Sequence, residues 1–229
     1  MAHSRISPPI ILLNFKCYLE ATGARAVQLA KYAQQVSEKL GVVVAVAPQA
    51  ADIRLVSQQA KVPVFAQHID PIAAGSHTGH MLAESVLEAG ASGVIINHSE
   101  RRLRADVIED TIVRARGLGL TTTVCANTPG IAEAIAALNP DMVAVEPPEL
   151  IGSGVAVSKA KPEIITDTVS RIRRINKDVM ILCGAGITSG NDVREALRLG
   201  TQGVILASGV VKARNQLAAI EDLASGCRC

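Results

Sequence analysis

The sequence is poor in aromatic residues: it contains no tryptophan, two tyrosines and two phenylalanines among 229 residues. Proteins that bind single-stranded nucleic acid by base stacking need several aromatic side chains, so this scarcity argues against that function. The formal net charge is +2, and the chain has no block of like charges that would attract a polyanion. We therefore expect no nucleic-acid partner.

Long apolar runs are also missing. No stretch is long enough to span a bilayer, and residues 1–9 lack the apolar core of a signal peptide. These absences predict a cytoplasmic protein without a membrane partner.

Cysteine is sparse, and its spacing matches no metal-binding motif. The five cysteines are Cys17, Cys125, Cys183, Cys227 and Cys229. An odd number in a cytoplasmic chain favours reduced, packed thiols, and we expect no metal. Whether Cys227 or Cys229 forms a disulfide stays open at this point.

Aliphatic residues dominate what is present, since 48% of the chain is hydrophobic although only 2% is aromatic. Short β-branched runs alternate with longer amphipathic stretches, as buried parallel strands alternate with helices. The predicted strands cover residues 9–13, 42–47, 62–66, 93–97, 120–126, 141–146, 178–183 and 203–207. The predicted helices cover residues 22–40, 51–60, 81–89, 105–118, 129–138, 162–176, 192–199 and a last segment ending near residue 223.

Eight strand–helix units without a linker or a change in composition predict an α/β fold with parallel strands and right-handed crossovers. Eight such units in 229 residues favour a (β/α)8 TIM barrel formed as a single domain over residues 1–229. A doubly wound open sheet is the alternative, although such sheets usually have fewer units.

Active sites of (β/α)8 barrels form where the carboxyl ends of the strands meet. The residues that directly follow the predicted strands are therefore the candidates for chemistry. They are Asn14, Lys16, His98, Glu100, Glu146, residues 184–186 and residues 207–209.

Glu146 stands at the end of an apolar strand and is followed by Pro147 and Pro148, which prevent further sheet pairing. Gly152 and Gly154 then make the following loop flexible. A carboxylate beneath a movable loop is suited to act as a general base protected from water. The alternative is a carboxylate that only caps neighbouring backbone.

Two turns made of small residues, 184–186 and 207–209, each precede a helix and could admit a phosphate. Both could instead be ordinary tight turns. Lys16 would hold such an anion and stabilise negative charge on a substrate oxygen, unless it is only a solvated surface lysine. Glu100 is expected to pair with Lys16 or to cap the turn after the fourth strand.

His98 is expected to begin a short helical turn capped by Ser99, where its cationic form is disfavoured and neutral imidazole can donate a hydrogen bond. The alternative is a structural histidine. His68, His77 and His80 lie in a long loop, and their spacing fits loop packing or a subunit contact better than a metal site.

Five segments, in chain order, resemble the triosephosphate isomerase family, and the resemblance covers nearly the whole chain. They are Asn14-Phe15-Lys16, Asn97-His98-Ser99-Glu100, residues 145–152, Gly184-Ala185-Gly186 and Leu206-Ala207-Ser208-Gly209. The turns at residues 183–187 and 67–71 look like the shorter archaeal branch of that family.

The resemblance implies interconversion of glyceraldehyde 3-phosphate and dihydroxyacetone phosphate, a step of glycolysis and gluconeogenesis, without a metal or organic cofactor. Glu146 would be the base, neutral His98 the electrophile, and Lys16 with Asn14 would stabilise the enediolate. Glu100 would lie behind these residues and contact them without touching the substrate. The residues implied in substrate binding are Asn14, Phe15, Lys16, Ile151, Gly184, Gly186, Ala207 and Ser208. The resemblance also implies a lid after Glu146 and a homotetramer, with a homodimer as the alternative.

The chain departs from the bacterial and eukaryotic members at two places. The fifth strand ends in Cys125-Ala126-Asn127-Thr128, a segment in which those enzymes carry a glutamate, and Gly79-His80 stands where they usually have Gly-Glu. Two other functions stay open: a different phosphate-binding barrel enzyme, such as a sugar-phosphate epimerase, or a barrel that binds phosphorylated metabolites without catalysis.

Overall fold

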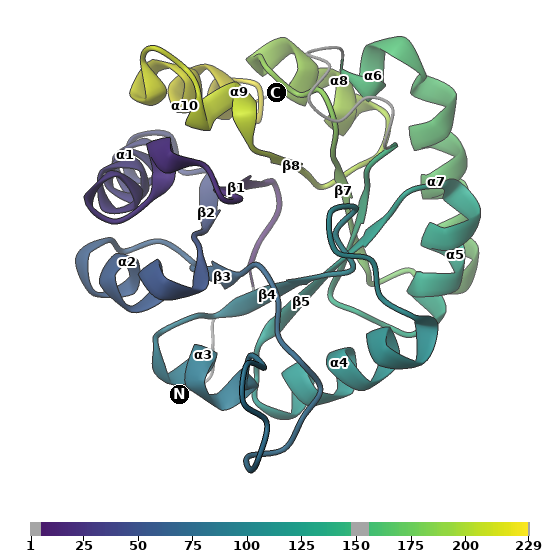
Figure 1. Cartoon of the computed structure of the whole chain (residues 1–229). Helices are drawn as coiled ribbons and strands as arrows, with labels where there is room; N and C mark the ends of the chain where they lie inside the picture. The colour runs from purple at the N-terminus through teal and green to yellow at the C-terminus, as the bar shows by residue number, and fades with distance from the viewer. Residues whose placement is uncertain (1–5, 148–155, 229) are drawn as a thin grey trace.

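The structure, a computed structural model, describes residues 6–147 and 156–228 as a ring of strands surrounded by helices (Figure 1). Eight parallel strands form one sheet. In chain order they are β1 (Ile10–Asn14), β2 (Val43–Ala47), β3 (Phe65–Ala66), β4 (Gly93–Ile96), β5 (Thr121–Ala126), β6 (Met142–Val145), β7 (Met180–Cys183) and β8 (Gly203–Leu206).

Strand pairing closes the sheet into a nearly complete barrel. The order β2-β1-β8-β7-β6-β5-β4-β3 places the first strand beside the last one. Between β2 and β3 the ring is joined by one bridge, Val46 to Val64, and by a 3.0 Å hydrogen bond from the Val46 N–H to the Pro63 carbonyl. This closed parallel arrangement confirms the predicted barrel and excludes the doubly wound sheet.

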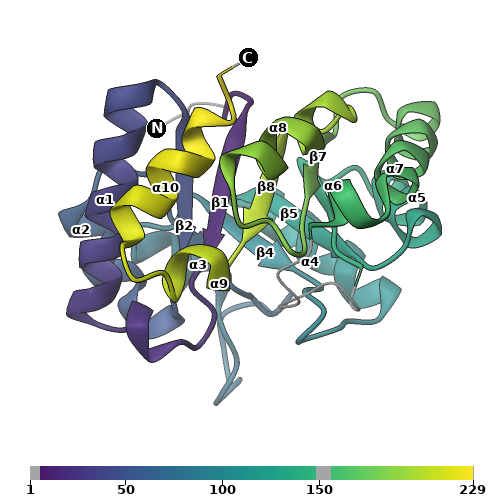
Figure 2. The same ribbon diagram turned by 90° about the horizontal axis from the view of Figure 1, so that it is seen from above.

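Helices cover the outside of the barrel, as Figures 1 and 2 show. The α-helices are α1 (Ala24–Leu40), α2 (Ile53–Gln59), α3 (Ala83–Glu88), α4 (Ala105–Gly117), α5 (Pro129–Ala137), α6 (Val157–Ala160), α7 (Pro162–Ile175), α8 (Gly190–Arg198), α9 (Ser208–Val211) and α10 (Gln216–Ser225). Two short 3-10 helices, η1 (Leu19–Ala21) and η2 (Ala50–Asp52), precede α1 and α2.

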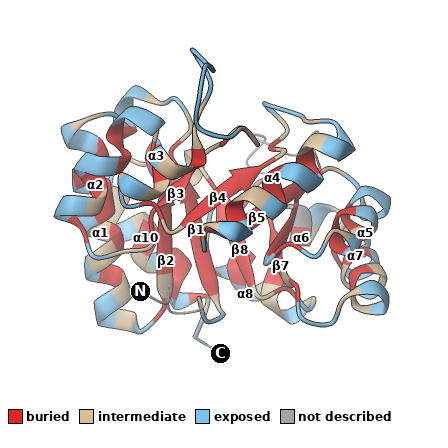
Figure 3. Cartoon of the chain, turned by 90° about the horizontal axis from the view of Figure 1, so that it is seen from below, coloured by how far each residue is buried: buried red, intermediate tan, exposed pale blue. Residues whose placement is uncertain are grey.

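The strands are buried on both faces, which explains their continuous apolar runs (Figure 3). In β1, Ile10 and Leu12 belong to the cluster inside the barrel, whereas Ile11 and Leu13 belong to the cluster between strands and helices. Side chains alternate in this way because successive residues of a strand point to opposite faces. The inner cluster is mostly aliphatic, with Phe65 as its aromatic member.

Several predicted elements differ from the structure. Helix α1 begins at Ala24, two residues after the predicted start, and the Thr22 hydroxyl donates to the Tyr18 carbonyl at 3.0 Å instead of capping this helix. Strand β3 has two residues in place of the predicted five, because beyond Phe65 and Ala66 this segment has only the Val64 bridge. The predicted last helix is divided into α9 and α10.

Helix α5 begins at Pro129 as predicted, and the Thr128 hydroxyl caps it by accepting a hydrogen bond from the Ile131 N–H at 3.3 Å. Cys17 is exposed, whereas Cys125 and Cys183 are buried, and all three are free thiols. Cys229 lies outside the described residues, so the question of a bond from the tail is not tested. Among the described residues, no helix is long and apolar enough to cross a membrane.

Candidate active site

A cavity of about 460 Å³ opens at the carboxyl ends of the strands. Its wall brings together residues that lie far apart in the chain: Asn14 and Lys16 after β1, His98 and Glu100 after β4, and Glu146 after β6. The other side of the wall consists of residues 185–188 and 205–209, which follow β7 and end β8. The barrel therefore gathers the predicted polar groups around one space opposite the two small-residue turns.

Lys16 is held through both its backbone and its side chain. Its φ of 47° is left-handed, which is unusual for a residue with a side chain. The Asn14 Oδ1 accepts from the Lys16 N–H at 2.9 Å, and the Gln67 Nε2 donates to the Lys16 carbonyl at 2.9 Å. The Lys16 Nζ donates to the Glu100 Oε1 at 2.9 Å, which confirms the predicted pairing of these two residues.

His98 follows β4 in a hydrogen-bonded turn closed by the Arg101 N–H and the His98 carbonyl at 2.8 Å. The predicted helical turn is therefore wrong, because the chain leaves this turn without continuing into a helix. The Glu100 N–H donates to the His98 Nδ1 at 3.2 Å. Since a backbone N–H always carries its proton, this bond favours the neutral tautomer in which Nε2 holds the hydrogen.

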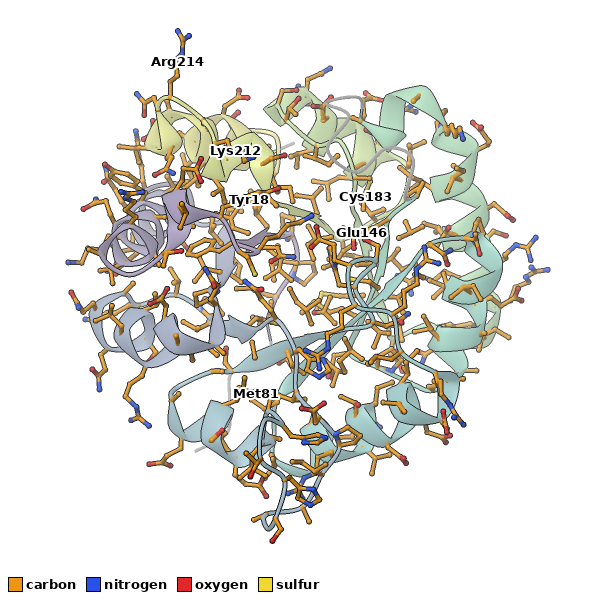
Figure 4. The ribbon with its side chains drawn as sticks, viewed as in Figure 1. Tyr18, Met81, Glu146, Cys183, Lys212 and Arg214 are labelled. Atoms are coloured by element: carbon orange, nitrogen blue, oxygen red, sulfur yellow. The ribbon has the colours of Figure 1, made fainter. Side chains whose placement is uncertain are left out.

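Glu146 is buried, with 6% of its surface exposed, yet its Oε2 has no hydrogen-bond partner within residues 6–147 and 156–228. That oxygen lies 3.6 Å from the His98 Nε2. Figure 4 shows Glu146 near the middle of the ring of strands. An unsatisfied buried carboxylate oxygen is costly, and it is a common feature of groups that act on a ligand.

Two buried thiols flank Glu146, and both remain protonated. Burial above all raises the pKa of Cys125, and the nearby negative charge of Glu146 raises it further. Burial likewise raises the pKa of Cys183, with added contributions from Glu146 and Asp192. Cys125 and Glu146 line the same small space of about 30 Å³. Neither thiol therefore competes with the carboxylate as a negatively charged base.

The turn after β7 is shaped by the close approach of Glu146. A Cβ on Gly184 would lie 2.3 Å from the Glu146 Cγ, so a side chain at this position would have to displace Glu146. Ala185 and Gly186 follow with φ of 71° each, which turns the chain sharply beside the cavity. Across the cavity, Ala207, Ser208 and Gly209 form the second turn at the start of α9.

Comparison with known proteins agrees with this geometry. The sequence model of the family described as Triosephosphate isomerase matches residues 9–223. The chain belongs to the triosephosphate isomerase family.

Curated relatives of the same name are similar over nearly their full length. The triosephosphate isomerase of Methanocaldococcus jannaschii is 52% identical over 93% of this chain and 98% of its own. That of Methanothermus fervidus is 54% identical over 94% of this chain and 97% of its own. The protein from Methanosarcina mazei is 53% identical over the same shares. The similarity to these archaeal sequences confirms the resemblance to the archaeal branch of the triosephosphate isomerase family.

The residues predicted from the family motifs divide into three groups. Asn14, Lys16, His98, Glu100, Glu146, Gly186, Ala207 and Ser208 line the cavity. Phe15 and Gly184 do not: Phe15 is fully buried among the strands and helices, and Gly184 lies against Glu146. Ile151 lies outside the described residues.

Sequence reasoning missed several residues that the fold of this triosephosphate isomerase family member brings to the site. Tyr18 lines the cavity, and the Lys212 Nζ lies 4.4 Å from the centre of its ring, as their neighbouring positions in Figure 4 also show. Asn97 and Cys125 lie beside Glu146. Only Asn97 belonged to a recognisable motif, and no local pattern indicated the contacts of the other residues.

Proposed function

We propose that the chain is a triosephosphate isomerase that interconverts D-glyceraldehyde 3-phosphate and dihydroxyacetone phosphate through an enediolate. The observation that carries this proposal is the buried Oε2 of Glu146, which has no hydrogen-bond partner in the described part of the chain and lies 3.6 Å from the His98 Nε2 in a cavity that Lys16 also lines. A base, a neutral hydrogen-bond donor and a cation then face one small substrate.

Glu146 takes the proton from the carbon beside the substrate carbonyl and becomes a neutral acid. The electron pair of that C–H bond forms the C=C bond of the enediolate, and the carbonyl oxygen gains negative charge. The Lys16 ammonium and the His98 Nε2–H stabilise this oxygen, with Asn14 holding the Lys16 backbone in place. These roles are the ones that the family resemblance implies.

Glu146 then returns its proton to the neighbouring carbon, which completes the isomerisation without net gain or loss of atoms. His98 gives its Nε2 proton to one oxygen and takes a proton from the other. The Nδ1 bond from the Glu100 N–H supports this role, because it leaves the Nε2 proton facing the cavity. The family resemblance assigns no step to a metal or an organic cofactor.

The substrate phosphate binds between residues 186 and 207–209. Small residues there let backbone N–H groups approach an anion closely. Ile151 contributes from a lid after Glu146, which keeps water from the enediolate, although this segment lies outside the described residues. Gly184 affects substrate binding indirectly, because its lack of a side chain leaves room for Glu146. Phe15 affects it indirectly as well, through its neighbours Asn14 and Lys16.

The decisive experiment is a coupled assay of the purified chain with each triose phosphate, in EDTA. Turnover in both directions is expected. Glu146→Gln and His98→Gln should each lower kcat by about 10²–10⁴-fold while the fold is retained by circular dichroism. Turnover that requires added metal would favour another sugar-phosphate enzyme, and phosphate-ester binding without turnover would favour a non-catalytic barrel.

We also propose a homotetramer in the cytoplasm, with the loop of His68, His77 and His80 serving loop packing or a subunit contact. Support comes from the resemblance to the archaeal branch. Light scattering of the purified chain distinguishes a tetramer from the alternative dimer, and a monomer at micromolar concentration would contradict both.

A further inference from the structure

Asn97 has an unusual backbone conformation between β4 and His98. Its φ of 59° lies in the left-handed region. Asparagine is the non-glycine residue that tolerates this region best, together with aspartate. Because Asn97 directly precedes His98, this turn sets the direction in which the imidazole leaves the end of β4.

The Asn97 side chain uses both ends of its amide. Its Nδ2 donates to the Cys125 carbonyl at 2.9 Å, and its Oδ1 accepts from the Leu103 N–H at 2.8 Å. Since a carbonyl can only accept and an N–H can only donate, these partners fix the orientation of the amide. The side chain therefore ties the end of β4 to the end of β5 and to the segment that leads into α4.

This tie connects the two proposed catalytic groups. His98 follows β4 and Glu146 follows β6, and β5 lies between these strands and pairs with both. Cys125, whose carbonyl accepts from Asn97, also lies beside Glu146. Asn97 and Glu146 also line the same small space of about 30 Å³. Asn97 thus contacts both the turn that carries His98 and the residues that surround Glu146.

We propose that Asn97 is a positioning residue, which fixes the His98 imidazole relative to Glu146 by bridging β4 and β5. This inference rests on the proposed isomerase function. Asn97 lines the small space behind Glu146 and not the substrate cavity. Its effect on turnover is therefore indirect, through the placement of His98.

Asn97→Gly tests the bridge, because glycine keeps the left-handed backbone but removes both side-chain hydrogen bonds. We expect kcat to fall about tenfold or more with little change in KM, because small displacements of catalytic groups strongly reduce turnover. Asn97→Asp should also lower kcat, since its carboxylate can accept from Leu103 but cannot donate to the Cys125 carbonyl.

Asn139→Gly is the matched control. Asn139 is also left-handed, with φ of 58°, and its Oδ1 accepts from the Asn176 Nδ2 at 2.9 Å. It precedes β6, at the opposite end of the barrel from the cavity. This variant should lower thermal stability in the same way as Asn97→Gly but keep wild-type kcat.

The His98 ring resonances in ¹³C,¹⁵N-histidine-labelled protein provide a measurement that does not depend on activity. They are assigned by their loss in His98→Gln. Asn97→Gly should shift them, and Asn139→Gly should not. Wild-type kcat together with wild-type His98 resonances in Asn97→Gly would overturn the proposal. If the wild-type chain itself shows no turnover, the isomerase function fails, and the resonances alone decide whether Asn97 positions His98.

Discussion

Gly184 and Glu146 occupy space that two side chains could not share: a Cβ on Gly184 would lie 2.3 Å from the Glu146 Cγ and 2.9 Å from its Oε1. The two residues follow neighbouring strands, β7 and β6, whose pairing fixes their separation. The lack of a side chain at position 184 thus allows the buried position of the proposed base.

Gly184→Ala should displace the Glu146 carboxylate, since backbone on both strands is held by the sheet. We expect kcat to fall by as much as about 10²-fold, with a smaller change in KM. Gly130→Ala is the control, because a Cβ there meets no atom of the described residues within 4 Å. Steady-state kinetics of both variants test the prediction, and full turnover by Gly184→Ala would contradict it.

Glu100→Gln should lower kcat/KM only modestly, by up to about fivefold, because Glu100 is exposed and such ion pairs contribute little. The glutamine oxygen can still accept from the Lys16 Nζ. Lys16→Met should be much more damaging, since it removes the cation from the cavity.

The Lys39–Glu221 pair, with the same 2.9 Å separation far from the cavity, offers a matched control. Glu221→Gln should leave kcat/KM unchanged. A loss in Glu100→Gln as large as that in Lys16→Met would show that Glu100 itself takes part in the chemistry.

Gly93→Ala should destabilise the barrel. A Cβ at Gly93 would lie 2.4 Å from the Phe65 Cε1 inside the ring of strands. Overpacking of this kind costs about 1–3 kcal/mol in the free energy of unfolding. Gly117→Ala, where a Cβ meets no atom within 4 Å in the part of the chain that the structure describes, should be neutral or stabilising by up to about 1 kcal/mol. Urea denaturation of both variants measures the difference, and equal effects would contradict the packing argument.

His68 should make stability depend on pH between neutrality and pH 5. Burial, as the largest effect, lowers the pKa of His68 below 6.5, and the charge of Arg101 lowers it further. The hydrogen bond between its Nε2 and the Asp70 Oδ1, at 3.0 Å, opposes this shift. The unfolded chain therefore binds a proton at a higher pH than the folded chain does.

The contribution of His68 is complete above pH 6.5 and declines as the pH falls towards its folded pKa. His68→Gln should accordingly lose less unfolding free energy between pH 7.5 and 5 than the wild type does. His77→Gln, a change at an exposed histidine of the same loop, should behave like wild type. A pH dependence in His68→Gln that equals that of the wild type would refute this assignment.

The carboxyl of Asp70 does not contribute to this pH dependence above pH 5, because its pKa is lowered from 3.8. Burial alone would raise the pKa of Asp70, but the hydrogen bonds from Met81 and His68 and the charge of Arg101 outweigh that effect.

The elements near the site show which structural features local sequence patterns can predict. The apolar runs of β1 and β6 and the cap at Thr128 were predictable, because strand burial and helix initiation depend on residues close together in the chain. The start of α1 and the short length of β3 were not predictable. The Thr22 hydroxyl has a competing acceptor at Tyr18, and strand length depends on which neighbour is within pairing distance.

The sequence by itself determined the order of the eight units and placed Lys16, His98 and Glu146 at strand ends, because periodicity and turn residues are local properties. Only the tertiary structure decided three contacts near the site. The Glu100 N–H donates to the His98 Nδ1, and the Asn97 side chain donates to the Cys125 carbonyl. The Glu146 side chain occupies the space where a Cβ of residue 184 would lie. These contacts depend on the separation of neighbouring strand ends. That separation is set only when the barrel has closed, and no short stretch of sequence encodes it.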